Sequence, residues 1–169
     1  MNPHRWMIVM VGVLLVGAGV LMQDLATYEP LWVDEGWSIA AAEQGTLIDV
    51  TEFVAADVHP PLYFQILAVW DALTGRTIFG LRTLSVLIVL LSAALVYKLG
   101  RDVMNPYAGV LAALLFVLHD LIGVLGREVR QYPLTQFMAV LVMVLVLKLY
   151  VEDTLGERVS VVGESTDGA

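Results

Sequence analysis

The sequence predicts an all-α integral membrane protein with about four membrane-spanning helices. Of its 169 residues, 59% are hydrophobic and only 15% are charged, whereas soluble domains are about half apolar and a quarter charged. The apolar residues also gather in four long runs. The absence of cysteine excludes a disulfide-stapled fold. The formal net charge of −8 argues against a nucleic-acid partner, because neutralising phosphates requires a basic face.

The four apolar runs predict spans over residues 6–25, 81–99, 107–126 and 133–150. A helix of about 20 apolar residues crosses a hydrocarbon core of roughly 30 Å. His119 and Asp120 interrupt the third run, and the sequence assigns them no role. A signal peptide is the alternative for the first run. A retained helix is favoured, because the run exceeds the roughly 7–15 apolar residues of a signal peptide and no convincing cleavage site follows.

The distribution of basic residues predicts the orientation. The basic residues beside the expected spans fall mainly on one side, and they are Arg5, Lys98, Arg101, Lys148 and Arg158. The acidic loop 26–80, which should contain short interfacial helices, carries Arg76 as its one lysine or arginine. We therefore expect a multi-pass protein of the plasma membrane with a cytoplasmic amino terminus and loop 26–80 outside. The polar residues 152–169 predict a disordered tail.

The first chemical cluster lies in the long loop, where Asp34 and Glu35 stand between Trp32 and Trp37. Tryptophans favour the membrane interface. A short helix is expected from residue 35 to residue 44, with Asp34 near its amino-terminal end. The helix dipole would favour the ionised carboxylate there. The alternative is a helix cap followed by a solvated acid.

The second cluster is His59-Pro60-Pro61, which precedes an amphipathic segment over residues 62–73. The prolines restrict the backbone and favour an extended His59. Asp57 could orient the imidazole or raise its pKa. The alternative is that the prolines only begin a helix and that His59 caps it.

The third cluster joins the third and fourth runs and contains Arg127, Glu128, Arg130 and Tyr132. Its two arginines oppose the predicted charge bias, and a planar guanidinium suits bidentate phosphate contact. Snorkelling at the bilayer edge is the alternative. Together the residue types of the three clusters are those needed for a hydroxyl group to attack a phosphate-linked group. Their spacing alone is equally consistent with a lipid-phosphate binding module.

Four strings in this order resemble the GT-C membrane glycosyltransferases: Leu31–Glu35, His59–Tyr63, Leu81–Ser85 and Glu128–Tyr132. The chain is most similar to the branch that resembles dolichyl-phosphate-mannose protein mannosyltransferases, and the resemblance extends from about Arg5 to Tyr150. It implies an inverting hexosyl- or mannosyltransferase that moves a sugar from a polyprenyl-phosphate donor to an acceptor hydroxyl outside the membrane.

The resemblance also implies roles for individual residues. Asp34 would be the general base, with Glu35 beside it, and Arg130 would hold the donor phosphate. The further residues implied at the substrate are Arg127 as a secondary candidate, Glu128, Tyr132, His59, Pro60 and Pro61. The branch implies neither a metal nor another cofactor, although other GT-C enzymes use a divalent cation. The expected partners are the lipid-linked donor, membrane lipid and an acceptor that the sequence does not identify.

Family members carry many more spans than four. Residues 1–151 therefore correspond to the amino-terminal membrane part of such an enzyme, and the chain is expected to be truncated, with the remainder of the enzyme as a partner. Two alternatives stay open. One is a non-catalytic membrane subunit that binds a lipid phosphate or a partner protein. The other is a small transporter or scaffold that assembles around His119 and Asp120.

Overall fold

The structure is a computed structural model that describes residues 3–23, 25 and 30–166, with side chains described at 5–23, 25 and 30–150. The described part consists of helices and their connections. In chain order the helices are α1 (Pro3–Met22), α2 (Val33–Ala42), α3 (Leu47–Ala55), α4 (Leu62–Thr74), α5 (Ile78–Val103), α6 (Pro106–Val117), α7 (Asp120–Leu125) and α8 (Tyr132–Thr166).

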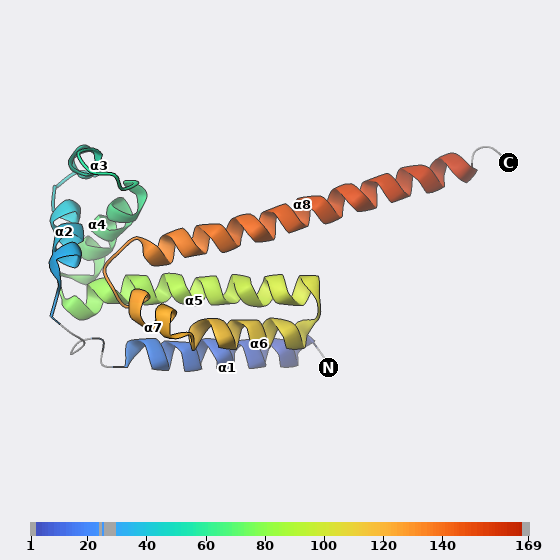
Figure 1. The fold of residues 1–169 in the computed structure, drawn as a ribbon, viewed down its shortest axis with the longest axis horizontal. Helices are drawn as coiled ribbons and strands as arrows, with labels where there is room; N and C mark the ends of the chain where they lie inside the picture. Colours follow the sequence, from blue (N-terminus) through green and yellow to red (C-terminus); the bar gives the residue numbers. More distant parts are fainter. Residues whose placement is uncertain (1–2, 24, 26–29, 167–169) are drawn as a thin grey trace.

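The helices form a bundle with a cap at one end (Figure 1). Helices α1, α5 and α6 lie side by side, and α8 packs against α5 near its own start before it diverges. The short helices α2, α3 and α4 gather at the end of the bundle where α5 and α8 begin. The cap therefore comes from the predicted loop 26–80, and its short helices confirm that part of the predicted fold.

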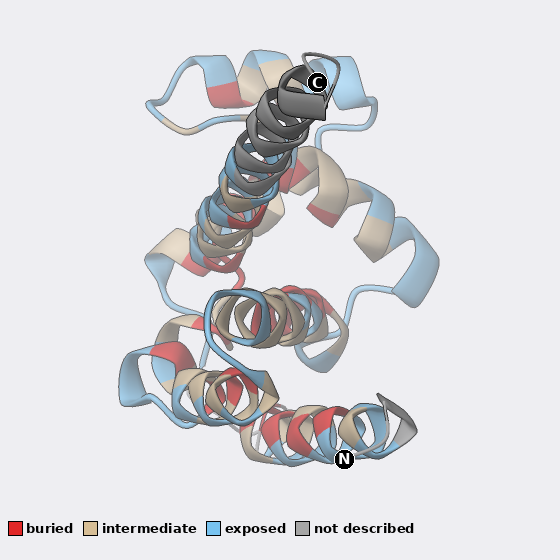
Figure 2. Ribbon diagram, turned by 90° about the vertical axis from the view of Figure 1, so that its right-hand side faces the viewer, coloured by how far each residue is buried: buried red, intermediate tan, exposed pale blue. Residues whose placement is uncertain are grey.

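Three of the described helices are long and apolar enough to cross a membrane, namely those over Arg5–Met22, Ile78–Val103 and Tyr132–Tyr150. Many residues of these helices are exposed or only partly buried (Figure 2). Only 22% of the first segment and 11% of the third lie buried inside the protein. Exposed apolar side chains such as Leu15 and Leu149 would be costly in water but are favourable against lipid. The fold is thus the expected all-α membrane architecture.

The expected third span over residues 107–126 consists of two helices in the structure rather than one continuous helix. Helix α6 ends at Val117, and α7 begins at Asp120. Between them His119 adopts an extended backbone, with ψ 128°, and its imidazole Nδ1 accepts a hydrogen bond from the Leu121 N–H at 3.2 Å. The side chain thereby caps a new helix and replaces a backbone partner that a continuous helix would supply.

The carboxy-terminal segment over residues 152–169, where a disordered tail is expected, begins as a continuation of α8. Its backbone continues α8 as far as Thr166, while residues 167–169 lie outside the described part. No proline follows Pro133, and residues such as Glu152, Leu155 and Glu157 have high helix propensity. The expected disorder of this tail stays a prediction.

The α5–α6 hairpin depends on close backbone contact between two glycines. A Cβ atom on Gly109 would lie 2.5 Å from the Tyr97 carbonyl oxygen, and one on Gly100 would lie 2.9 Å from the Gly109 Cα. Asn105 begins α6, because its Oδ1 accepts hydrogen bonds from the N–H groups of residues 107 and 108, each at 3.0 Å. The hairpin packs α6 closely against α5, the helix that α4 of the cap also contacts.

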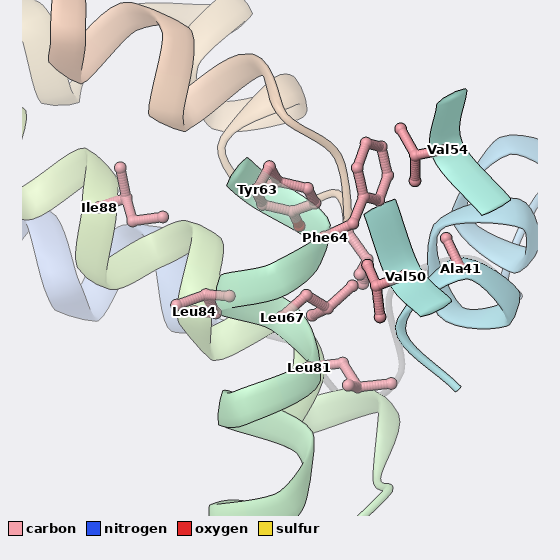
Figure 3. Close-up of a cluster of buried hydrophobic side chains, with 10 residues drawn as sticks. Ala41, Val50, Val54, Tyr63, Phe64, Leu67, Leu81, Leu84 and Ile88 are labelled. Carbon is pink, nitrogen blue, oxygen red and sulfur yellow. The ribbon is translucent and has the colours of Figure 1, made fainter. Parts of the chain in front are cut away.

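The cap shares one hydrophobic core with the bundle (Figure 3). This core joins α2, α3, α4 and α5 to the connection between α7 and α8, and its buried members are Ala41, Val50, Val54, Tyr63, Phe64, Leu67, Leu81, Leu84, Ile88 and Val129. Val129 is fully buried although it lies in a connection. Burying one such side chain is worth about 1.5–3 kcal/mol. The core therefore holds the connection over residues 126–131 against the cap.

Candidate active site

The two adjacent acids of α2 have different surroundings. Both lie in the first turn of the helix, as the sequence predicts. The Asp34 side chain is 43% exposed, whereas the Glu35 side chain is 1% exposed. Successive residues of a helix point about 100° apart, so one acid faces the surroundings and the other faces the core. Asp34 is therefore the carboxylate that a second molecule can reach.

Glu35 is held by a buried ion pair with Arg82 of α5. Arg82 donates from Nε to Glu35 Oε1 at 3.1 Å and from Nη2 to Oε2 at 2.9 Å. The Val129 N–H donates to the same Oε1 at 2.9 Å. Both carboxylate oxygens are thus engaged inside the protein. The two neighbouring acids can therefore not have the same role, because Glu35 is not accessible to a substrate.

Arg130, which belongs to the connection between α7 and α8, lies beside Asp34 of α2. Its Nη1 donates to the Asp34 carbonyl oxygen at 3.2 Å, and its Nη2 lies 3.7 Å from Asp34 Oδ2. The guanidinium is 6% exposed, and its Nε is buried without a hydrogen-bond partner among the described residues. A buried donor without a partner is costly, and an anion is one ligand that would satisfy it.

His59 completes the group from a third segment, the turn before α4. Its Nε2 lies 3.5 Å from Arg130 Nη2, and its Nδ1 lies 2.9 Å from Asp57 Oδ2. The Val58 N–H, followed by the His59 imidazole, holds the pKa of Asp57 below its ordinary value. The ring of Trp37 packs against the imidazole with ring centroids 5.8 Å apart. Asp57 thus orients His59 as the sequence indicates.

The two prolines of this motif begin α4. Pro61 is the residue before the first helical position, and it makes no side-chain capping bond. His59 does not cap the helix, because its ring contacts Asp57 and approaches Arg130 instead. Pro60 is exposed and Pro61 half-buried. Their contribution visible in the structure is a stiff turn that presents the imidazole.

Glu128 and Tyr132 flank Arg130. Burial, followed by the nearby Glu35 carboxylate, raises the pKa of Glu128 above its ordinary value. Glu128 Oε2 is buried without a hydrogen-bond partner among the residues that the structure describes. The Tyr132 ring lies with its centroid 5.7 Å from Arg130 Cζ, which is cation–π distance. Both side chains therefore border the same group.

Arg127 points elsewhere. Its Nη2 donates to the Val20 carbonyl oxygen at 2.7 Å, in the last turn of α1. The carboxy-terminal carbonyls of a helix attract cations through the helix dipole. Arg127 therefore ties the connection 126–131 to α1, whereas Arg130 faces Asp34.

Arg82 is a residue of this region for which the sequence predicts no role at the substrate. Its signal is a charged residue inside an apolar run, for which an interior partner is the default expectation. No three histidine or acidic side chains in the described part of the chain gather closely enough to hold a metal ion. The group can offer an exposed carboxylate and an imidazole, each within 3.7 Å of the same guanidinium.

The fold and this group define a helical membrane protein with a charged site at the capped end of its bundle. The family model for dolichyl-phosphate-mannose-protein mannosyltransferase matches residues 58–163, and the chain belongs to that family, whose members are membrane glycosyltransferases. The match includes His59, Arg82 and Arg130, whereas Asp34 lies amino-terminal to it. No curated protein and no solved structure matches the chain.

Proposed function

We propose that this protein transfers a sugar from a polyprenyl-phosphate-linked donor to an acceptor hydroxyl. The observation that carries the proposal is the pairing of an exposed carboxylate with a buried guanidinium. Asp34 Oδ2 and Arg130 Nη2 lie 3.7 Å apart, although the two residues are 96 positions apart in the sequence. Family membership supports the reaction class.

Asp34 is the proposed general base. Its carboxylate takes the proton of the acceptor hydroxyl, whose oxygen attacks the anomeric carbon of the donor sugar. The bond between that carbon and the phosphate oxygen breaks, and its electron pair stays on the phosphate. A single displacement of this kind inverts the anomeric configuration. General-base catalysis contributes about 10²–10⁴ to such a rate.

Arg130 is the proposed phosphate ligand. Its guanidinium is nearly buried, so its attraction for an anion is screened less than at a surface. Negative charge grows on the phosphate as the sugar departs, and a preorganised cation stabilises that charge. His59 lies 3.5 Å from the same guanidinium and supplies a second contact for the phosphate. Glu128, Tyr132, Pro60 and Pro61 border the donor in this proposal, and Glu35 supports the site from within.

The proposed reaction takes place on the outer side of the plasma membrane, with loop 26–80 outside and the amino terminus in the cytoplasm. The absence of cysteine makes this testable. Ala55 in the cap and Val103 at the far end of α5 are both exposed. A membrane-impermeant maleimide added to intact cells should label the Ala55→Cys variant and spare Val103→Cys. The reverse pattern would contradict the orientation.

A transfer assay tests the function itself. The full chain in nanodiscs is given polyprenyl-phosphate-linked hexoses, and release of free polyprenyl phosphate is measured with and without hydroxyl acceptors. Arg130→Lys keeps the charge but loses the two-pronged guanidinium geometry, so partial activity is expected, and Arg130→Ala should be lower still. Donor binding that depends on Arg130, with no release under any condition, would instead identify a non-catalytic lipid-phosphate binding subunit.

A further inference from the structure

We propose that Glu35 is a positioning residue whose buried pair with Arg82 sets the place of Arg130 relative to Asp34. The inference rests on the proposed function, because the geometry matters only if those two residues act on one substrate. It assigns the adjacent acids of α2 to separate tasks. Asp34 meets the acceptor, and Glu35 aligns the site.

The connectivity of the pair is the first argument. Glu35 is the chain neighbour of Asp34, and Val129 is the chain neighbour of Arg130. The Glu35 carboxylate accepts the Val129 N–H at 2.9 Å, and Arg82 holds both of its oxygens. One side chain therefore links the backbones directly beside the two functional residues. A shift of Glu35 would move Arg130 with it.

A contact from α5 holds the same peptide unit at its other polar group, the Glu128 carbonyl. Ser85, about one turn after Arg82 on α5, donates from Oγ to the Glu128 carbonyl oxygen at 2.6 Å. The Val129 side chain itself lies in the core shared with the cap. The peptide unit between Glu128 and Val129 is thus hydrogen-bonded to side chains through both its C=O and its N–H. Arg130 emerges from a fixed backbone.

The energetics favour a role beyond stability. A buried ion pair is seldom more stabilising than apolar side chains of the same volume, because both charges lose their hydration. Here the side chains of Arg82 and Glu35 are 2% and 1% exposed. The charges instead fix the geometry of the contact. A guanidinium and a carboxylate form directional hydrogen bonds to each other, and this pairing leaves Glu35 Oε1 able to accept the Val129 N–H as well. Small displacements of a catalytic group reduce its effect steeply.

Binding of undecaprenyl phosphate to the full chain in nanodiscs tests the inference. The dissociation constant is measured for the wild type, Glu35→Gln, Arg130→Ala and the double variant. Glu43→Gln is the matched control, because Glu43 pairs with Arg76 at the exposed surface of the cap. If Glu35 acts through Arg130, Glu35→Gln weakens binding about tenfold in the wild-type background. In a protein that already carries Arg130→Ala, adding Glu35→Gln changes binding by no more than about twofold. The control leaves binding unchanged.

Each of the other possible results would contradict one specific part of the proposal. An equal loss in both backgrounds would mean that Glu35 only stabilises the fold, and no loss in the wild type would remove the positioning role. If Arg130→Ala itself leaves binding unchanged, the proposed phosphate site fails instead. If Glu35→Gln does not accumulate as folded protein, the double variant Glu35→Gln/Arg82→Gln replaces it, because that variant leaves no unpaired charge buried in the protein. The same loss is expected for that pair, and unchanged binding would overturn the inference.

Discussion

Arg130 and Asp34 meet through both the backbone and the side chain of the acid. The guanidinium donates to the Asp34 carbonyl oxygen at 3.2 Å while its Nη2 lies 3.7 Å from the carboxylate. The carbonyl contact does not depend on the charge of Asp34. Substitutions of the Asp34 side chain can therefore test its chemistry while the carbonyl contact with Arg130 stays available.

Arg127 should matter for stability and little for substrate binding. Its hydrogen bond to the Val20 carbonyl ties the connection 126–131 to the end of α1. Arg127→Ala is expected to destabilise the protein by about 1–3 kcal/mol, the usual cost of losing a charged hydrogen bond. Thermal unfolding in detergent measures this, and Arg127→Lys should lose less because it keeps a cation at the helix end. A large loss of undecaprenyl phosphate binding at unchanged stability would assign Arg127 to the substrate instead.

Glu128 should make stability depend on pH. Its pKa is raised in the folded protein above an ordinary value of 4.5, first by burial and then by the nearby Glu35. The stability that this group contributes is present below pH 4.5 and is lost as pH rises through the folded pKa. Glu128→Gln should therefore unfold at a higher temperature than the wild type at pH 7, and the gap should close in acid. A constant gap at every pH would contradict this cause, and Glu52→Gln in exposed α3 is the control.

The α5–α6 hairpin should not tolerate a methyl group on Gly109. The added Cβ would lie 2.5 Å from the Tyr97 carbonyl oxygen and 3.0 Å from the Arg101 nitrogen. Both are backbone atoms that cannot rotate away, so Gly109→Ala should cost about 1–3 kcal/mol. Gly19→Ala in α1 is the matched control, because a Cβ there meets nothing within 4 Å. Equal unfolding temperatures for the two variants would show that the helices are not this close.

Much of the fold and of the site can be predicted from the sequence. Long apolar runs predict the membrane helices because length and composition suffice for that decision. Asp34, His59 and Arg130 each stand in a short motif whose residue types have a chemical use, and the structure brings the three together. Their roles in transfer stay predictions.

Other features depend on tertiary contacts that no local pattern contains. Glu35 and Arg82 are 47 positions apart, and their pairing follows only from how the cap packs on α5. The break between α6 and α7 occurs in an apolar run without proline, where the capping by His119 replaces the usual signal. The sequence contains one apolar run there, interrupted by two polar residues, whereas the backbone forms two helices.

The central claim is tested most directly by comparing Asp34→Asn with Arg130→Ala in both binding and transfer. Asp34→Asn should bind undecaprenyl phosphate nearly as well as the wild type, while sugar transfer falls by about 10²–10⁴, the contribution of a general base. Arg130→Ala should lose binding and transfer together. Transfer at the wild-type rate by Asp34→Asn would contradict the account, because no other exposed carboxylate is assigned to the acceptor proton.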